Sequence, residues 1–210
     1  MVFGATGGVG QHVVRRAAEA GHQVTAFART PEKLEARDGV EVVRGDAFDA
    51  AAVAASITGQ EAVISCLSSS APMKRSDEVT RMVINIVQGM RTAGVDRITY
   101  CASAGVEGEL LGPIGRGVMW LLRHALADHR GALASIANSG LTATVARPTS
   151  LSNASFDPNY LEAFEGMPNS SRPIPRSSVA DFLVKALEQS DIYRNTSVGL
   201  ALPKRDQSSA

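Results

Sequence analysis

A glycine-rich segment near the start of the chain, Gly4-Ala5-Thr6-Gly7-Gly8-Val9-Gly10, constrains its fold more than any other feature. It follows a short apolar run and precedes a helical pattern, which is the order strand, turn, helix. The first glycine permits a tight turn, the second lets a diphosphate approach the backbone, and the third lets the helix pack closely on a sheet. The helix N-terminus then presents unpaired N–H groups to an anion. We therefore expect phosphate contacts from Gly4, Thr6, Gly7, Gly8, Val9 and Gly10.

The residues after this motif complete a strand–helix–strand unit. Apolar side chains recur at helical spacing between Val9 and Ala20, and Gly21 stands where a helix commonly ends. The segment 23–28 is rich in strand-forming residues. Such a unit within about thirty residues is typical of dinucleotide sites. Only three residues precede Gly4, whereas parallel strands commonly have about five or six, so either the first strand is short or further residues precede it.

The charged residues after the second predicted strand indicate which dinucleotide binds. Proteins selective for NAD usually place Asp or Glu there, where it binds the ribose 2′-hydroxyl. Here the first charged side chain is Arg29, whose guanidinium suits a 2′-phosphate. Thr30 can add a hydroxyl and Lys33 a second positive charge. We therefore expect NADPH (NADP⁺) rather than NADH. The alternative is that Arg29 is a solvated loop residue.

The length is that of one compact α/β domain, and the partner we expect for it is a small-molecule substrate. The 210 residues suffice for a single NAD(P)-binding domain, 1–210. Lys+Arg and Asp+Glu number 21 each, so no charge excess indicates nucleic acid or an anionic membrane. Cys66 and Cys101 lack metal-ligand spacing and are expected as reduced thiols in a cytoplasmic protein. We expect no metal site, no signal peptide or membrane span, and a monomer or small homo-oligomer.

Strand and helix patterns alternate along the rest of the chain. Strands are predicted at 40–44, 62–65, 97–101, 141–146 and 196–201, and helices at 50–57, 76–93, 117–139 and 177–189. This alternation predicts a doubly wound parallel sheet, the Rossmann fold, with its ligand at the carboxyl ends of the strands.

Three finer features are also predicted. The helix over 117–139 should bend near Gly131, and its apolar part, 118–122, should cover the sheet or line a pocket. The last helix should be capped by Ser177 or Ser178. The segment 150–176, rich in Ser, Asn and Pro and with a helical pattern only at 160–164, should form a loop or lid on the substrate side.

Several short motifs occur in a characteristic order along essentially the whole chain. They are Gly4-Ala5-Thr6-Gly7-x-x-Gly10, Gly21-His22-x-Val24-Thr25-Ala26-x-x-Arg29-x-Pro31-x-Lys33-Leu34, Gly45-Asp46, Gly94-Val95-Asp96-Arg97, Asp128-His129, Ser139-Gly140-Leu141 and Arg147-Pro148. With these motifs the chain resembles the atypical short-chain dehydrogenases/reductases. It is most similar to their NmrA-like and biliverdin-IXβ/flavin reductase branch.

This resemblance implies positions for the cofactor and for the reaction. The implied cofactor contacts are Asp46 and Ala47 at the adenine, Leu67 and Ser68 at the ribose and phosphates, and Cys101 and Ala102 at the nicotinamide. Ser103 would hydrogen-bond the reacting group, where an oriented hydroxyl can stabilise developing negative charge. His129 falls near the position of the usual catalytic tyrosine.

Two departures from the family pattern limit the expected chemistry. The Tyr-x-x-x-Lys pair is absent, because Leu133 stands four residues after His129. Thr149 replaces the histidine that follows the proline of the sixth strand, and a threonine cannot donate a proton as an imidazolium can. A flavin, a quinone or a related conjugated ring tolerates this loss, because such a ring can take its proton from water. We therefore expect an NADPH-dependent oxidoreductase that transfers hydride to such a ring. The alternatives are an NADP(H)-sensing regulatory protein of NmrA-like type and a biosynthetic enzyme that uses the scaffold for a non-redox step.

Overall fold

Parallel strands make up most of the central sheet. The computed structural model describes residues 1–70, 73–170 and 172–204. In this part of the chain the strand order is β3-β2-β1-β4-β5-β6-β10-β8, and only β8 runs antiparallel to its neighbour. The strands are β1 (Val2–Phe3), β2 (Val24–Ala28), β3 (Val40–Arg44), β4 (Ala62–Ser65), β5 (Arg97–Cys101), β6 (Thr142–Pro148), β8 (Leu161–Ala163) and β10 (Thr196–Ala201). This order confirms the predicted doubly wound sheet, whose strand order reverses between β1 and β4.

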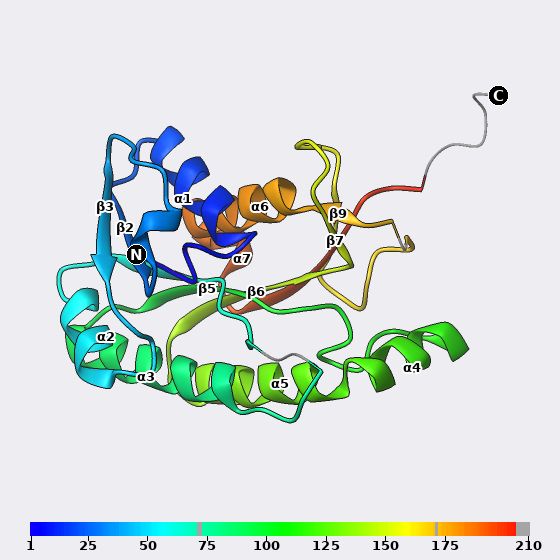
Figure 1. Ribbon diagram of the computed structural model, residues 1–210. Helices are drawn as coiled ribbons and strands as arrows, with labels where there is room; N and C mark the ends of the chain where they lie inside the picture. Colours follow the sequence, from blue (N-terminus) through cyan, green and yellow to red (C-terminus); the bar gives the residue numbers. More distant parts are fainter. Residues whose placement is uncertain (71–72, 171, 205–210) are drawn as a thin grey trace.

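Helices cover both faces of the sheet (Figure 1). On one face lie α1 (Gly10–Glu19) and α6 (Arg176–Glu188), and on the other lie α2 (Ala50–Ile57), α3 (Glu78–Ala93) and α5 (Arg123–Ala137). The short helices are η1 (Pro31–Lys33) and α7 (Ser190–Tyr193). Successive strand side chains point to opposite faces. Val2 therefore packs with α1 and α6, while Phe3 packs in the core under α3. No helix in the described residues is long and apolar enough to cross a bilayer.

The helical segment after β5 differs from its prediction. It consists of α4 (Gly112–Leu121) and α5, which are separated at Leu122 and not at Gly131. At Gly131, α5 crosses close to α3, because a Cβ there would overlap the Thr80 side chain. The glycine thus allows close packing and causes no bend. Instead of covering the sheet, α4 projects from it and has no buried residue, and the Leu111 and Ile114 side chains are 88% and 83% exposed.

The C-terminal third contains two further corrections. The helical pattern at 160–164 is wrong, because Leu161–Ala163 form β8, which pairs with the edge of β10. Neither predicted serine caps α6. The Ser178 hydroxyl donates instead to the Asp157 carbonyl, and Ser177 Oγ is buried without a partner among the described residues. The segment before α6 also contains β7 (Leu151–Ser152) and β9 (Ile174–Pro175), which pair in a separate two-stranded sheet beside the carboxyl edge of the main one.

Candidate functional site

A cavity of about 160 Å³ opens where β1, β2, β3 and β4 end. It is lined by Gly4, Thr6, Gly7, Phe27, Ala28, Arg29, Gly45, Asp46, Ala47, Cys66, Leu67, Ser68 and Met82. Of the predicted cofactor residues, the structure thus brings together Gly4, Thr6, Gly7, Arg29, Asp46, Ala47, Leu67 and Ser68. Gly8, Val9 and Gly10 continue from this wall into the first turn of α1. Thr30, Lys33, Cys101 and Ala102 lie outside the lining.

The glycine-rich loop forms a cradle that side chains would fill. Gly4 has a φ of 73°, and a Cβ there would lie 2.6 Å from the Cys66 carbonyl oxygen. A Cβ on Gly10 would overlap the Gly4 carbonyl oxygen, so α1 can begin this close to the turn only with glycine. The Gly7 N–H donates to that same oxygen at 2.9 Å and closes the turn. The open backbone at the start of α1 fits the diphosphate of a dinucleotide.

One arginine lines this cavity and a second one contacts it from the neighbouring strand. Arg29 follows β2 and is exposed, and Arg44 ends the neighbouring β3, paired in register with Ala28. Arg44 Nη1 donates to the Arg29 carbonyl oxygen at 3.3 Å and also forms an ion pair with Glu32. Sequence reasoning missed Arg44. The position of Arg44 next to Arg29 follows from the register of β2 against β3. The sequence alone does not give that register.

The loop after β3 is held by its own side chain and by α3. Asp46 Oδ1 accepts a hydrogen bond of 3.0 Å from the Phe48 N–H, so the carboxylate stabilises a local turn. Asn85 Nδ2 donates to the carbonyl oxygens of Ala47 and Phe48 at 2.9 and 3.1 Å. Asn85 thereby positions the predicted adenine-side residues from another element. Nothing in the helical pattern around Asn85 distinguished it from an ordinary polar residue.

The loop after β4 is tied to the first turn of α3. The Ser70 N–H and hydroxyl both donate to the Glu78 carboxylate, and the Ser69 hydroxyl donates to it at 3.1 Å. These bonds, the Ser70 backbone bond first, lower the pKa of Glu78. The buried Asp128 of α5 accepts the amides of Val79 and Thr80 at 3.1 and 2.8 Å. Asp128 therefore caps the N-terminus of α3 from α5, a helix that is distant in the sequence but packed against it.

The two cysteines lie at the ends of adjacent strands and are both free thiols. Burial raises the pKa of Cys101 to about 12, and burial together with Cys101 raises the pKa of Cys66 well above its usual value. Both thiols are therefore protonated near neutral pH, and neither is poised as a nucleophile.

Ser103 and Thr149 lie at the carboxyl edge of adjacent strands. The Ala104 N–H donates to the Pro148 carbonyl oxygen at 2.9 Å, which places the loop after β5 against the end of β6. Among the described residues, the Ser103 hydroxyl donates one long hydrogen bond, of 3.3 Å, to the carbonyl oxygen of Ala104. The Thr149 hydroxyl donates to the Arg172 carbonyl oxygen at 3.1 Å, so Thr149 connects β6 to the segment before α6.

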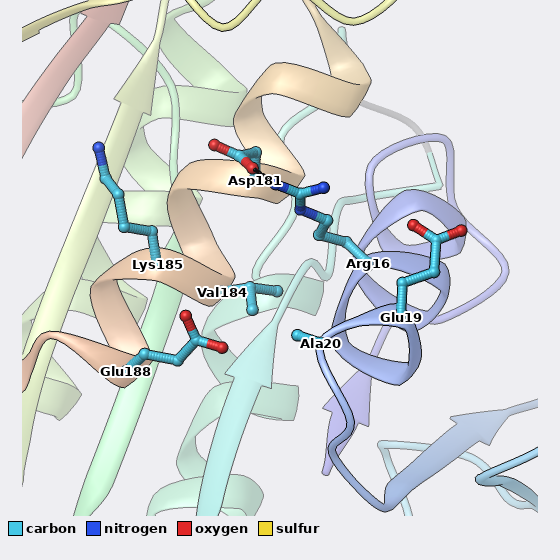
Figure 2. Close-up of a pocket in the computed structure, with 7 residues that line it drawn as sticks. All are labelled: Arg16, Glu19, Ala20, Asp181, Val184, Lys185 and Glu188. Carbon is cyan, nitrogen blue, oxygen red and sulfur yellow. Dashed lines mark hydrogen bonds and ion pairs between the residues drawn. The ribbon is translucent and has the colours of Figure 1, made fainter.

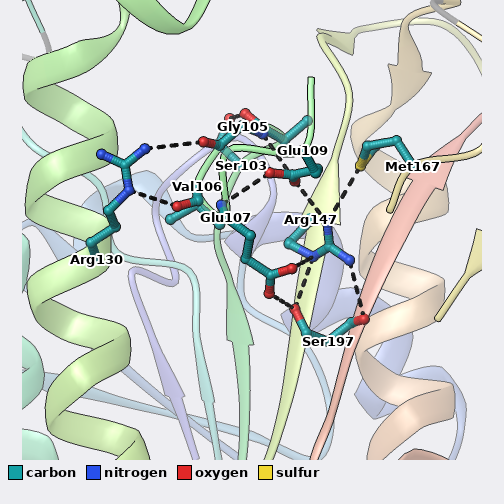
Figure 3. A network of polar contacts seen from close by, with 10 residues as sticks. Ser103, Gly105, Val106, Glu107, Glu109, Arg130, Arg147, Met167 and Ser197 are labelled. Carbon is teal, nitrogen blue, oxygen red and sulfur yellow. Dashed lines mark hydrogen bonds and ion pairs between the residues drawn. The ribbon is translucent and has the colours of Figure 1, made fainter. Parts of the chain in front are cut away.

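A buried charge network holds the loop that contains Ser103 (Figure 3). Arg147, only 1% exposed, donates to Glu109 Oε1 at 2.7 Å and to Ser197 Oγ at 2.8 Å. Glu109 in turn accepts the amides of Gly105 and Glu107, each at 3.0 Å. Burial raises the pKa of Glu109, but hydrogen bonds from its own backbone and from Arg147 outweigh this, and the pKa stays below its usual value. The carboxylate is therefore ionised at neutral pH.

His129 contacts the sheet through a tyrosine that sequence reasoning missed. Its Nδ1 lies 2.6 Å from Tyr100 Oη, and the two rings meet edge to face. Burial lowers the pKa of His129, and the nearby Asp128 only partly offsets this. Burial also raises the pKa of Tyr100. Both rings are therefore neutral near pH 7, so His129 can relay a proton only as a neutral imidazole.

This pairing predicts a measurable titration. Because burial lowers its pKa, the ¹³C-labelled His129 ring should gain its proton with a midpoint below about pH 6.5, the value of an unperturbed imidazole. Replacing Tyr100 with phenylalanine should remove the hydrogen bond and shift the His129 ring resonances at pH 7. NMR titration of the wild type and the Tyr100→Phe variant checks this. A titration midpoint for His129 at pH 6.5 or above would contradict the assignment.

Comparisons with known proteins agree with this geometry. A family model described as NAD(P)H-binding matches residues 4–190. A curated (4-alkanoyl-5-oxo-2,5-dihydrofuran-3-yl)methyl phosphate reductase from Streptomyces griseus is 37% identical over 108 residues, which are 51% of this chain and 35% of that protein. The chain thus matches about a third of the length of this relative.

Solved structures show the same fold at low sequence identity. A short-chain dehydrogenase/reductase from Veillonella parvula, in complex with NADP, superposes with a TM-score of 0.83 at 19% identity, over 96% of this chain and 93% of that one. ChuY, an anaerobillin reductase from Escherichia coli, superposes with a TM-score of 0.80 at 21% identity, over 98% and 97% of the two chains. At these identities the likeness establishes the fold alone.

Proposed function

Because the chain belongs to the NAD(P)H-binding family, we propose that it is an NADPH-dependent oxidoreductase that reduces a conjugated small molecule such as a flavin or a quinone. The observation that carries the proposal is one cavity that joins the glycine cradle to Arg29. The match to a protein named as a reductase and the fold shared with a dehydrogenase/reductase support the reaction class. The identity of the hydride acceptor, a conjugated ring, is inferred from the chemistry of the side chains at the site.

Arg29 is proposed to select NADPH over NADH. Its guanidinium is exposed beside the cavity and forms no ion pair among the described residues. The nearby Glu32 pairs with Arg44 instead. A guanidinium binds a phosphate through charge-assisted hydrogen bonds, whereas a bare hydroxyl offers it little. No carboxylate follows β2 directly, where NAD-selective proteins bind the 2′-hydroxyl.

Replacement of Arg29 with alanine tests this selectivity. We expect NADP⁺ binding to weaken by about 1–3 kcal/mol, roughly 5- to 150-fold, because charge-assisted bonds to the 2′-phosphate are lost. NAD⁺ binding should remain as in the wild type, because NAD⁺ lacks that phosphate. Isothermal titration calorimetry with both nucleotides measures the ratio. Arg37→Ala, which removes an arginine that pairs with Glu19, serves as the matched control. Equal losses for the two nucleotides would exclude Arg29 from the 2′-phosphate site.

On the reaction side, the described residues are proposed to supply hydrogen bonds and positioning but no charged acid. When bound, the reduced nicotinamide supplies the hydride. We assign the Ser103 hydroxyl to donate a hydrogen bond to the acceptor atom that gains negative charge. His129 is neutral and bonded to Tyr100, and Thr149 donates to Arg172, so neither offers a proton as a cation would. An acceptor that takes its proton from water suits this arrangement.

The experiment that tests the function is stopped-flow oxidation of NADPH in the presence of FMN, quinones and tetrapyrroles. We expect turnover with at least one of these conjugated rings and a lower rate for Ser103→Ala. The lack of a charged acid also favours a second function, an NADP(H)-sensing protein. In that case NADPH binds tightly and no acceptor in the panel is reduced, which would overturn the reductase proposal.

A further inference from the structure

The helices α1 and α6 run parallel and begin at the same end. They lie side by side on one face of the sheet (Figure 1), and Figure 2 shows the Arg16–Asp181 ion pair that joins them. Near the C-terminal ends of both helices, His22 Nε2 lies 2.9 Å from Glu188 Oε1. Both helices therefore start beside the glycine-rich loop. The positive ends of two helix dipoles meet there, which favours an anion at this point.

The first residue of α6, Arg176, lies directly against this loop. A Cβ on Gly8 would lie 2.7 Å from Arg176 Nε and 2.8 Å from its Cδ, so the arginine occupies the space where any other residue at position 8 would carry its side chain. Arg176 Nη1 donates to Asn153 Oδ1 at 2.7 Å. The guanidinium is thus held across the loop by a residue of the segment after β7.

Arg176 places a positive charge next to the glycine-rich loop. Among the described residues, no carboxylate forms an ion pair with it. The first turn of α1 contains no acidic residue either. Its positive charge reaches His12, whose pKa is lowered by burial first and then by Arg15 and Arg176. A guanidinium that no described carboxylate pairs with, two helix N-termini and a glycine cradle are features that favour the binding of a phosphate group.

We propose that Arg176 is a second cofactor-binding residue, which binds the diphosphate of NAD(P)H across Gly8, and that Asn153 positions its guanidinium. This inference rests on the proposed cofactor function. Under this proposal the two arginines bind different phosphate groups of the cofactor. Arg29 binds the phosphate that only NADPH carries, whereas Arg176 binds the diphosphate that NADPH and NADH share. Arg176 should therefore set the affinity for both nucleotides without changing the preference between them.

Calorimetric titration of Arg176→Ala with NADP⁺ and NAD⁺ tests whether Arg176 binds the diphosphate that the two nucleotides share. We expect both dissociation constants to rise by roughly 10- to 100-fold, in equal proportion, because the lost bonds are charge-assisted. Arg15→Ala, which removes a nearby positive charge that pairs with Glu19 on the exposed side of α1, is the matched control and should change either constant by less than about threefold. Asn153→Ala should weaken binding in the wild type and have no further effect in Arg176→Ala.

The outcomes separate this inference from the proposal on which it rests. If the wild type binds neither nucleotide, the cofactor function itself is overturned. If the wild type binds both and Arg176→Ala binds as tightly, or loses NADP⁺ alone, only the role of Arg176 is overturned. A lower melting temperature with unchanged dissociation constants would show a structural role and would also overturn it. Arg176→Gln, which retains hydrogen-bonding groups for Asn153, repeats the test if the alanine variant is unstable.

Discussion

Arg147→Met should lower the free energy of unfolding by about 3–5 kcal/mol, because it leaves a buried carboxylate without its partner. Arg147 is 1% exposed and Glu109 is 8% exposed, and the two side chains are joined at 2.7 Å. Methionine fills much of the space but cannot satisfy Glu109. Because Glu109 also accepts two amides of the loop after β5, the loop that carries Ser103 should lose its fixed position. Urea denaturation of both proteins measures the loss.

A matched pair of variants shows whether the buried charge is responsible. Arg147→Met combined with Glu109→Gln removes both charges and should recover part of the lost stability. Arg37→Ala breaks a 3.8 Å ion pair whose partners are 34% and 50% exposed, and should cost less than about 1 kcal/mol. A loss in Arg147→Met no larger than that of Arg37→Ala would refute the argument.

The same network predicts a loss of stability in acid. The pKa of Glu109 is lower in the folded protein than in the unfolded chain, so the unfolded state binds a proton first as the pH falls. The contribution of Glu109 is therefore fully present above about pH 4.3, the value for an unperturbed glutamate, and is lost as the pH falls through its folded pKa.

Gly10→Ala is expected to have the second large effect, a loss of about 3 kcal/mol of stability together with loss of NADP⁺ binding. A Cβ on Gly10 overlaps the carbonyl oxygen of Gly4, which is backbone and cannot rotate away. The first turn of α1 must then move from the end of β1, and the amides of the cradle move with it. Thermal denaturation and calorimetric titration with NADP⁺ measure the two losses.

Gly117→Ala is the control for this substitution. Gly117 lies inside α4 and its φ is not positive. Apart from its chain neighbours and the backbone of its own helix, no described atom lies within 4 Å of an added Cβ. Alanine is favoured over glycine inside a helix, so this variant should be as stable as the wild type or more stable by up to about 1 kcal/mol. If Gly10→Ala also proves neutral, α1 does not depend on the close approach to Gly4.

Local patterns in the sequence were sufficient for most of the fold. The strand ranges 40–44, 62–65, 97–101 and 196–201 agree with the structure residue for residue, as does the helix at 50–57. Periodicity reports local conformation, and alternating strands and helices allow few arrangements other than a doubly wound sheet. The sequence also indicated which loops lie together, because the carboxyl ends of parallel strands share one edge.

Predictions failed where a residue serves a neighbour distant in the chain. Gly131 looked like a helix break but allows α5 to cross Thr80 of α3. The segment 160–164 has a helical pattern, yet the free edge of β10 converts part of it to a strand. Local propensity is weak, and in both cases a tertiary contact outweighs it.

The glycine motif, the alternation of elements and Arg29 after the second strand were determined by the sequence alone, because each depends on residues close together in the chain. Only the tertiary structure decided that Tyr100 bonds His129, that Arg147 holds the Ser103 loop and that Arg176 lies over Gly8. These partners are separated by many residues, and packing of the helices and strands brings them together. Contacts between residues so far apart in the sequence cannot be predicted from local patterns.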